Sequence, residues 1–202
     1  MNKQLLVDYT VFEVSPQQIN ESLSKNNGKL VVSGVLQRAE AKNQNGRIYP
    51  KDTLMREANK YADTFIKEKR ALGELDHPDS SVVNLNNVSH NVLDMQWKGD
   101  DLCGTVEVLG TPAGNILKEL FKSGIRLGIS SRGMGSVKEV MREGDDTLEV
   151  QPDFELIAFD FVSNPSTHGA FLSPVNEGKN SNIRTDKYAK VNKIITDIIK
   201  DF

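Results

Sequence analysis

Residues 88–109 read VSHNVLDMQWKGDDLCGTVEVL, in which two β-rich runs flank a short polar connection. The segment Lys98 to Asp101 holds a glycine between charged residues, so the whole stretch predicts a β-hairpin. A second hairpin is predicted by Ser136 to Arg142 and Thr147 to Gln151, with its turn at 143–146. Successive hairpins favour antiparallel sheets over the strand–helix alternation of a doubly wound fold. The sequence therefore predicts an α+β fold that is mainly antiparallel β.

Outside the hairpins, further strands are expected over three stretches, Val7–Val14, Lys29–Gln37 and Glu155–Val162. Gly34, inside the second of these, predicts a bulge or a close backbone approach. After Pro50, apolar residues recur at helical spacing as far as about Lys69, which predicts an amphipathic helix. Thr111 is suited to cap the start of another helix, and Gly124 to close it.

Composition excludes several classes of function. The chain has 202 residues and a formal net charge of −3, so it lacks the positive field that gathers nucleic-acid phosphates. Its one cysteine, Cys103, can form neither an internal disulfide nor a cysteine-based metal site, which indicates a reducing, intracellular compartment. The three histidines lack the close spacing of metal ligands on one helix, and no apolar run is long enough to span a membrane. We expect no metal, no direct nucleic-acid ligand and no membrane contact.

The domain organisation follows from shifts in composition. Residues 1–172 carry the predicted strands and helices and are expected to form one domain. Residues 173–186 are rich in Pro, Asn, Gly, Ser and charge, which is typical of a linker. Residues 187–202 place apolar side chains at helical spacing, which predicts a C-terminal amphipathic helix. Because so short a helix is marginal alone, its apolar stripe needs a partner, either its own domain or another chain.

Two segments have residue types that suit chemistry. His77 lies in GELDHP (73–78), a constrained turn that would fix the direction of an imidazole, whereas His90 in an alternating strand is expected to be structural. Residues 128–135 read GISSRGMG, which predicts tight backbone curvature with amides free to face an anionic oxygen. A structural turn or an anion-binding nest is the alternative. A serine nucleophile in this segment would need a base, for which His77 is the candidate.

Four motifs occur together and in order: NGRIYP at 45–50, ALGELDHP at 71–78, MQWKGD at 95–100 and GISSRGMGS at 128–136. With them, the chain resembles the prohead maturation proteases of T-even-type tailed bacteriophages, which are related to herpesvirus assemblins. The resemblance runs from about Gly34 to Pro165. It implies an assemblin-like small β-barrel with flanking helices, and a serine endopeptidase that needs no cofactor.

The resemblance also implies partners and a place of action. The substrates would be the scaffold or core proteins and the major capsid protein, cut inside the assembling prohead in the host bacterial cytoplasm. Association as a homo-oligomer, or only during assembly, is expected. The alternative in a different functional class is a catalytically silent core protein that keeps the fold and binds scaffold.

The resemblance assigns the first two catalytic roles by motif. His77 would be the general base and Ser130 the nucleophile. Ser131 remains the alternative nucleophile, because neighbouring side chains of an extended segment point to opposite faces and only one of them can meet His77. The oxyanion is expected to be bound by backbone amides around Arg132 and Gly133, with the Arg132 side chain either supporting it or forming a salt bridge.

The third catalytic residue is expected on the last strand. Asp160 lies between two phenylalanines there, so an inward-facing carboxylate would need a partner such as His77. The alternatives are His168, Asp153 and Glu155.

Substrate choice rests on the resemblance alone. It implies cleavage after glutamate with Ile or Leu two residues earlier. Such triplets also occur within this chain and end at Glu21, Glu68, Glu74 and Glu119. Self-cleavage is therefore expected to be possible, most readily at Glu21 in a polar connection.

Overall fold

The computed structural model describes residues 2–142 and 144–163, and within them the strands form three sheets. Sheet A has the order β1 (Gln4–Phe12), β7 (Leu127–Gly135), β10 (Glu155–Val162). Sheet B has the order β2 (Leu30–Arg38), β6 (Asp101–Val108), β5 (Val88–Lys98), β4 (Leu72–Glu74). Sheet C has the order β3 (Arg47–Ile48), β9 (Asp145–Val150), β8 (Val137–Arg142). Only β3 and β9 pair in parallel, so the predicted mainly antiparallel α+β fold is confirmed for the described residues.

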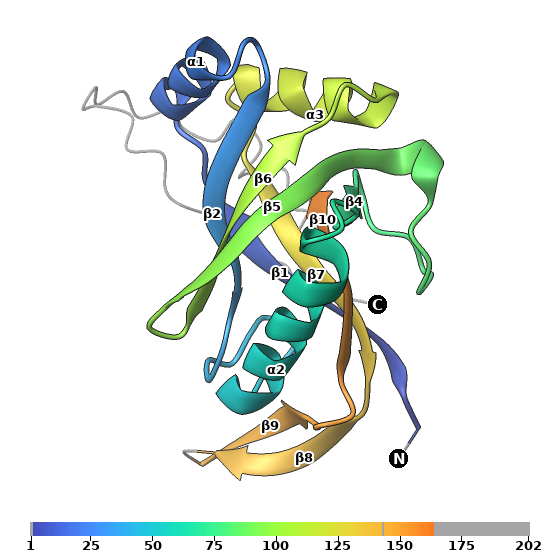
Figure 1. Ribbon diagram of the computed structural model, residues 1–202. Helices are drawn as coiled ribbons and strands as arrows, with labels where there is room; N and C mark the ends of the chain where they lie inside the picture. The colour runs from blue at the N-terminus through green and yellow to red at the C-terminus, as the bar shows by residue number, and fades with distance from the viewer. Residues whose placement is uncertain (1, 143, 164–202) are drawn as a thin grey trace, which may run out of the picture. The chain divides into compact units, whose positions relative to one another are not determined.

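The helices flank the sheets at two places. Their bounds are α1 (Pro16–Lys25), α2 (Lys51–Tyr61) and α3 (Pro112–Lys122), with a π-helical turn (Ala62–Ile66) after α2 and a 3-10 turn (Leu85–Asn87) before β5. Ser15 caps α1 in a capping box with Gln18, and Thr111 caps α3 by accepting from the Gly114 amide. Figure 1 shows α1 and α3 together at one end, and the β8–β9 hairpin at the other.

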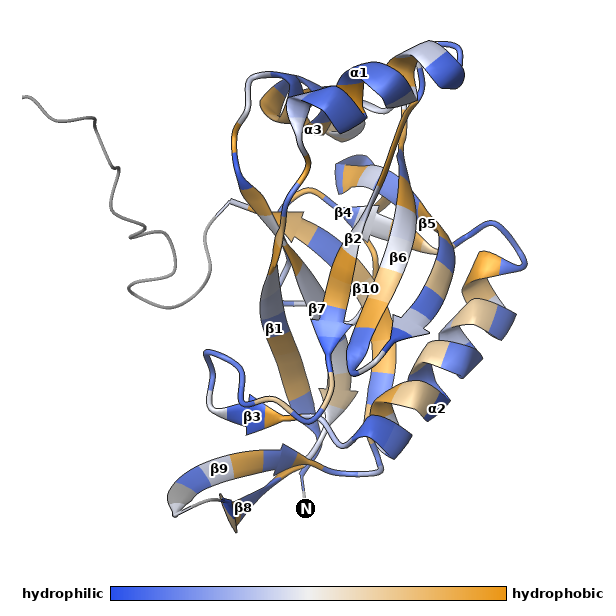
Figure 2. Ribbon diagram, turned by 90° about the vertical axis from the view of Figure 1, so that its left-hand side faces the viewer, coloured by the Kyte–Doolittle hydropathy of each residue, from blue (hydrophilic) through white to orange (hydrophobic). Residues whose placement is uncertain are grey.

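Aromatic packing fills the core between sheets A and B. The Phe161 ring meets the rings of Phe12, Phe121 and His90 edge-on, at centroid distances of 5.1, 5.3 and 4.7 Å. These four residues come from β10, β1, α3 and β5, so one cluster ties both sheets to a helix. Hydrophobic residues accordingly run along β1, β2 and β10, whereas the small helix α1 is mainly polar (Figure 2).

In the part of the chain that the structure describes, strand pairing joins sheets A and B along one side only. Leu75, just after β4, forms a parallel bridge with Phe161 of β10, and the Asp76 amide donates to the Phe161 carbonyl at 2.7 Å. On the other side, β1 is an edge of sheet A and β2 an edge of sheet B, and no strand pairing links them. Among the described residues the strands thus form no closed barrel, and the barrel implied by the resemblance is not confirmed. We call the opening between these two edges the β1–β2 seam.

The turn expected over residues 128–135 is wrong, because this segment is β7, the central strand of sheet A. Its glycines make room for aromatic rings. A Cβ on Gly128 would lie 1.5 Å from the Tyr9 ring, and one on Gly133 would lie 2.4 Å from the Phe154 ring. The two rings lie against the strand at positions where only glycine leaves room for them. The segment is extended throughout and makes no chain reversal.

The fold contains both predicted hairpins and a close approach at Gly34. Both hairpins form, as β5–β6 and β8–β9. A close approach at Gly34 is confirmed, because the Phe12 ring lies 2.6 Å from where its Cβ would be; Gly34 itself pairs in register with Gly104, and the register of β2 shifts only after it, between Val35 and Gln37. The predicted linker (173–186) and C-terminal helix (187–202) lie outside the described residues.

Candidate active site

The two serines of β7 face opposite sides of sheet A. Ser130 is paired with Tyr9 on β1 and Asp160 on β10, whereas Ser131 is paired with Asp8 and Phe159. Both serines are 1% exposed. The Ser131 hydroxyl donates to the Asp8 carbonyl at 3.3 Å, but the Ser130 hydroxyl has no hydrogen-bond partner among the described residues. Only Ser130 therefore has an uncommitted hydroxyl, and it shares a face with Asp160.

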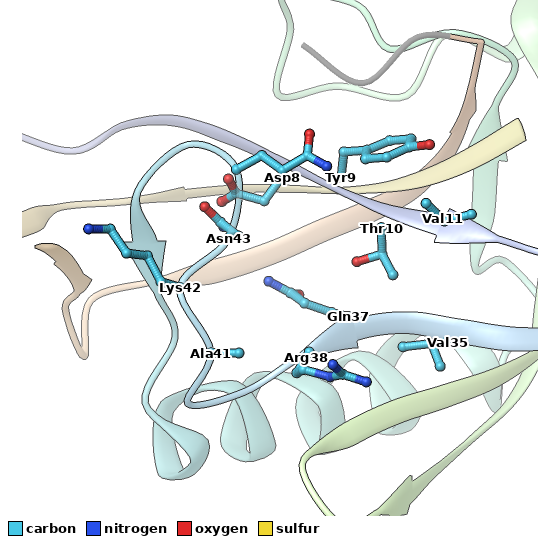
Figure 3. Close-up of a pocket in the computed structure, with 11 residues that line it drawn as sticks. Asp8, Tyr9, Thr10, Val11, Val35, Gln37, Arg38, Ala41, Lys42 and Asn43 are labelled. Atoms are coloured by element: carbon cyan, nitrogen blue, oxygen red, sulfur yellow. The ribbon is translucent and has the colours of Figure 1, made fainter. Parts of the chain in front are cut away.

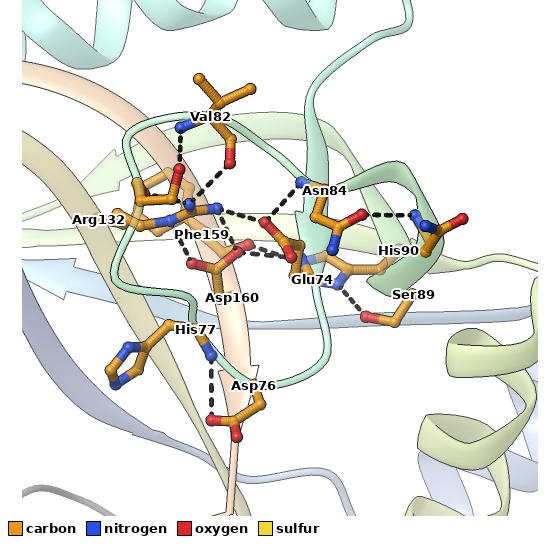
Figure 4. A network of polar contacts seen from close by, with 12 residues as sticks. Glu74, Asp76, His77, Val82, Asn84, Ser89, His90, Arg132, Phe159 and Asp160 are labelled. Carbon is orange, nitrogen blue, oxygen red and sulfur yellow. Dashed lines mark hydrogen bonds and ion pairs between the residues drawn. The ribbon is translucent and has the colours of Figure 1, made fainter.

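Arg132, two residues along β7 on the Ser130 face, is the centre of a buried charge network (Figure 4). Its Nε donates to Asp160 Oδ2 at 2.8 Å, and its Nη2 donates to Asp160 Oδ1 at 3.2 Å and Glu74 Oε1 at 3.0 Å. The three side chains are all 0% exposed. The guanidinium is fully engaged by these carboxylates and by backbone carbonyls, so the salt-bridge alternative for Arg132 is what the structure shows.

The same guanidinium fixes the loop that follows His77. Arg132 Nη1 donates to the Ser80 carbonyl at 2.7 Å and reaches the Val82 carbonyl at 3.5 Å. Glu74 Oε1 also accepts from the Asn84 amide at 3.0 Å. The network therefore links the serine-bearing strand to residues on both sides of the His77 turn.

Asp160 faces inwards, but its partner is not the His77 that the sequence suggested. Its carboxylate accepts from Arg132 and from the Glu74 amide at 3.0 Å, and no hydrogen bond between Asp160 and His77 occurs in the described structure. Burial raises the pKa of Asp160, and the Arg132 charge opposes that rise. Asp160 thus holds Arg132 in place.

The alternative third residues are occupied elsewhere or lie beyond the described part. Asp153 Oδ1 accepts from the amide and hydroxyl of Ser136, both at 3.0 Å, and Glu155 pairs with Lys3 at 2.8 Å. His168 lies outside the described residues.

His77 is half-buried in the turn after β4. Asp76 has a φ of 66°, and its carboxylate accepts from the His77 amide at 3.0 Å, so the turn is tightly constrained, as expected. The His77 Nδ1 atom is buried and has no hydrogen-bond partner among the described residues. Figure 4 shows its ring pointing away from Asp160. One ring nitrogen of the expected base is therefore uncommitted.

The chain is similar to known proteins in both sequence and structure. The family model described as "Prohead core protein serine protease" matches residues 10–181. The chain belongs to this family. The prohead core protein protease of Enterobacteria phage T4 is 32% identical over 148 residues, which are 72% of this chain and 68% of that protein. The solved structure of the bacteriophage T4 capsid assembly protease, gp21, has a TM-score of 0.69 and 27% identity, and the match covers 82% of this chain and all of that one.

Membership confirms that the chain is a prohead core protease and hence a peptidase of capsid maturation. The gp21 match also confirms the mixed α+β architecture. None of the helices that the structure describes could cross a membrane. Within residues 2–142 and 144–163, no three His, Cys, Asp or Glu side chains are grouped so that they could hold a metal ion.

Two residues of this prohead core protease were missed as partners. From the sequence, Glu74 was considered only within the GELDHP motif and as the end of a cleavage triplet, although an acid next to apolar residues in a short strand is a signal of a buried ion pair. Asp8, 4% exposed, accepts from Asn45 at 2.7 Å, from Arg47 at 2.9 Å and from the Tyr49 hydroxyl. The NGRIYP motif is thus a structural turn anchored on β1.

His90 is structural, as expected. It is fully buried, with Nδ1 2.9 Å from the Ser89 hydroxyl and Nε2 2.9 Å from the Phe159 carbonyl. Burial lowers its pKa to about 4, so the imidazole is neutral at physiological pH.

Proposed function

We propose that this prohead core protease is a serine endopeptidase with Ser130 as nucleophile and His77 as general base. One observation supports the assignment: Ser130 Oγ and His77 Nδ1 are both buried polar atoms without a partner in the described structure. Buried polar atoms are normally hydrogen-bonded, so two orphaned atoms on a serine and a histidine call for a functional explanation. Each lies in a motif that the sequence singles out for this role.

The chemistry would follow the serine–histidine scheme. His77 removes the proton of the Ser130 hydroxyl as its oxygen attacks the scissile carbonyl carbon. The same imidazole then gives that proton to the leaving amine, and water hydrolyses the acyl-enzyme. An amide beside Arg132 or Gly133 is proposed to donate to the oxyanion.

Asp160 enters the proposal as a positioning residue. Its carboxylate holds Arg132, which in turn holds the Ser80 and Val82 carbonyls just beyond His77. The relative placement of base and nucleophile would depend on this chain of contacts. Replacing Asp160 or Arg132 should therefore change the position of His77 without a direct contact to it.

The proposed substrates are scaffold or core proteins and the major capsid protein, cut after glutamate inside the prohead in the host cytoplasm. Self-cleavage after glutamate is part of the proposal, but the fold restricts it. Glu21, expected in a polar connection, lies in α1, while Glu74 lies in β4 and Glu119 in α3. Each of these segments must unfold locally before it can enter an active site as an extended chain.

A second reading is a catalytically silent core protein that binds scaffold. It is favoured by one observation, that no hydrogen bond joins Ser130 to His77 in the described residues.

A fluorophosphonate probe separates the two readings. We would label the wild type and the Ser130→Ala, Ser131→Ala and His77→Ala variants, and follow cleavage of a Leu-x-Glu peptide by mass spectrometry. The proposal expects labelling and cleavage in the wild type and Ser131→Ala, and loss of both in the other two. If the wild type stays unlabelled and uncleaving in the presence of capsid and scaffold proteins, the silent reading holds.

A further inference from the structure

We propose that Arg126 and Tyr9 form the subsite that binds an acidic side chain of the substrate beside Ser130. Arg126 lies immediately before β7 and Tyr9 lies on β1, both on the face of sheet A that carries Ser130. The inference rests on the proposed function, because Ser130 marks the place of the reaction. Neither Arg126 nor Tyr9 takes part in the catalytic steps proposed above.

The spacing of Arg126 places it in one row with the nucleophile. Arg126 directly precedes Leu127, the first residue of β7, and side chains two residues apart in an extended segment share a face. Residues 126, 128, 130 and 132 therefore form a row, with Arg126 at its end. Four residues of strand span about 13 Å. An extended arginine and an extended glutamate side chain can bridge that distance when they point towards each other.

The charge of Arg126 is available to a ligand. Its side chain is exposed and forms no hydrogen bond or ion pair with the residues that the structure describes. Each of the other arginines that the structure describes pairs with a carboxylate, including Arg132 in the same row. A cleft of about 300 Å³ opens beside Arg126, lined by residues 12–16 and 124–126. Glu13 is among its lining residues, but the described side chains of Glu13 and Arg126 form no ion pair. The guanidinium can therefore pair with a carboxylate from another chain.

Tyr9 covers the strand between Arg126 and Ser130. It pairs in register with Ser130, so its side chain emerges on the same face of the sheet. Its ring then crosses β7, because a Cβ on Gly128 would lie 1.5 Å from Tyr9 Cε2 and 2.3 Å from Tyr9 Cζ. Figure 3 shows this ring and the Thr10 side chain on opposite sides of β1. The Tyr9 hydroxyl, one bond beyond Cζ, therefore lies near Gly128, between the nucleophile and the arginine.

The Tyr9 hydroxyl is a donor without an acceptor. It is buried and has no hydrogen-bond partner among the described residues, whereas native structures normally pair such atoms. Burial raises the pKa of Tyr9, so the phenol keeps its proton at physiological pH. A glutamate that reaches Arg126 across the ring would pack its methylene groups on the ring and accept from this hydroxyl. Glutamine has the same shape but would lose the ion pair, so the subsite favours the acid.

The test measures binding without catalysis, in the full chain carrying Ser130→Ala. Fluorescence anisotropy would compare a labelled peptide, Ala-Leu-Thr-Glu-Ala-Thr, with the same peptide carrying Gln in place of Glu. We expect the Glu peptide to bind roughly fivefold more tightly at low salt, since one exposed ion pair distinguishes the two. Added salt should reduce that preference, because it screens exposed charges.

Single changes in the same Ser130→Ala chain assign the preference to its residues. Arg126→Gln should remove it, and Arg126→Lys should retain part of it. Tyr9→Phe should reduce it without lowering the melting temperature, because the hydroxyl has no partner to lose. Lys138→Gln is the matched control and should leave the preference unchanged. Lys138 is an exposed cation on the β8–β9 hairpin, at the opposite end of the molecule from α3 and the start of β7 (Figure 1).

Two results would overturn the proposal. One is equal binding of the Glu and Gln peptides, and the other is a Glu preference that survives Arg126→Gln or that Lys138→Gln removes equally well. Fluorophosphonate labelling of Ser130 is a separate readout. A labelled wild type whose Ser130→Ala form does not discriminate keeps the proposed function and loses this subsite. An unlabelled wild type whose Ser130→Ala form does discriminate loses the serine chemistry and keeps the subsite.

Discussion

Replacing Arg132 with methionine tests the charge network that underlies the proposed site. The change leaves the Asp160 and Glu74 carboxylates buried at 0% exposure without their cation. Removing one partner of a buried ion pair costs about 3–5 kcal/mol, because the remaining charge is uncompensated. Against a total stability of about 5–15 kcal/mol, that loss is large enough to be measured by urea denaturation.

The loss should depend on pH in a defined direction. Burial already raises the pKa of Asp160 above its ordinary value of 3.8, and losing Arg132 removes the charge that opposes the rise. A carboxyl with a raised folded pKa stabilises the fold below its unfolded pKa and loses that contribution as pH rises through the folded pKa. The Arg132→Met deficit should therefore be greatest at pH 7.5 and should shrink towards pH 4.5.

Arg142→Met supplies the matched control. Arg142 also pairs with two acids, Glu40 and Glu149, both at 3.0 Å, but its side chain is 37% exposed. Exposed pairs contribute about 0–1 kcal/mol, so this variant should change stability little at either pH. A cost below about 1 kcal/mol for Arg132→Met, or a deficit that is the same at both pH values, would refute the reasoning.

Two further changes test the packing around β10. The neutral, buried His90 has a pKa of about 4 against 6.5 when unfolded, so its contribution is complete above pH 6.5 and is lost as pH falls towards 4. That loss amounts to about 3 kcal/mol, and His90→Gln should remove it from the pH dependence of urea denaturation; an unaltered slope would contradict the assignment. A Cβ on Gly73 would lie 2.0 Å from the Phe159 carbonyl, so Gly73→Ala should lower the melting temperature by several degrees, whereas no change would show that β4 can move away.

Local patterns were enough to predict most of the fold. The β5–β6 hairpin follows from a glycine-containing turn between β-rich runs, and α3 from Thr111 at its cap. Those signals depend on residues close in sequence. The opposite faces of Ser130 and Ser131 were also predictable, because side-chain alternation holds in any strand.

Long-range packing accounts for what was missed. Glycines in residues 128–135 suggested a turn, yet they are required by rings of Tyr9 and Phe154 from elsewhere in the chain. Likewise, the pairing of Arg132 with Glu74 joins residues 58 positions apart, and no local pattern encodes it. The open seam depends on how two sheets meet, which a closed-barrel resemblance could not reveal.

The placement of Ser130 on a central strand has a consequence for dynamics. Amides in the middle of β7 exchange with solvent only when sheet A itself opens, at a free-energy cost close to that of global unfolding. The turn that carries His77 is held by the Asp76 amide bond to the Phe161 carbonyl and, through the loop that follows it, by Arg132 and Glu74, so fewer contacts must break to release it. The two halves of the proposed site therefore differ in rigidity. We expect a change that activates or inactivates the protease to act through the histidine turn, where the free-energy cost of a rearrangement is lower.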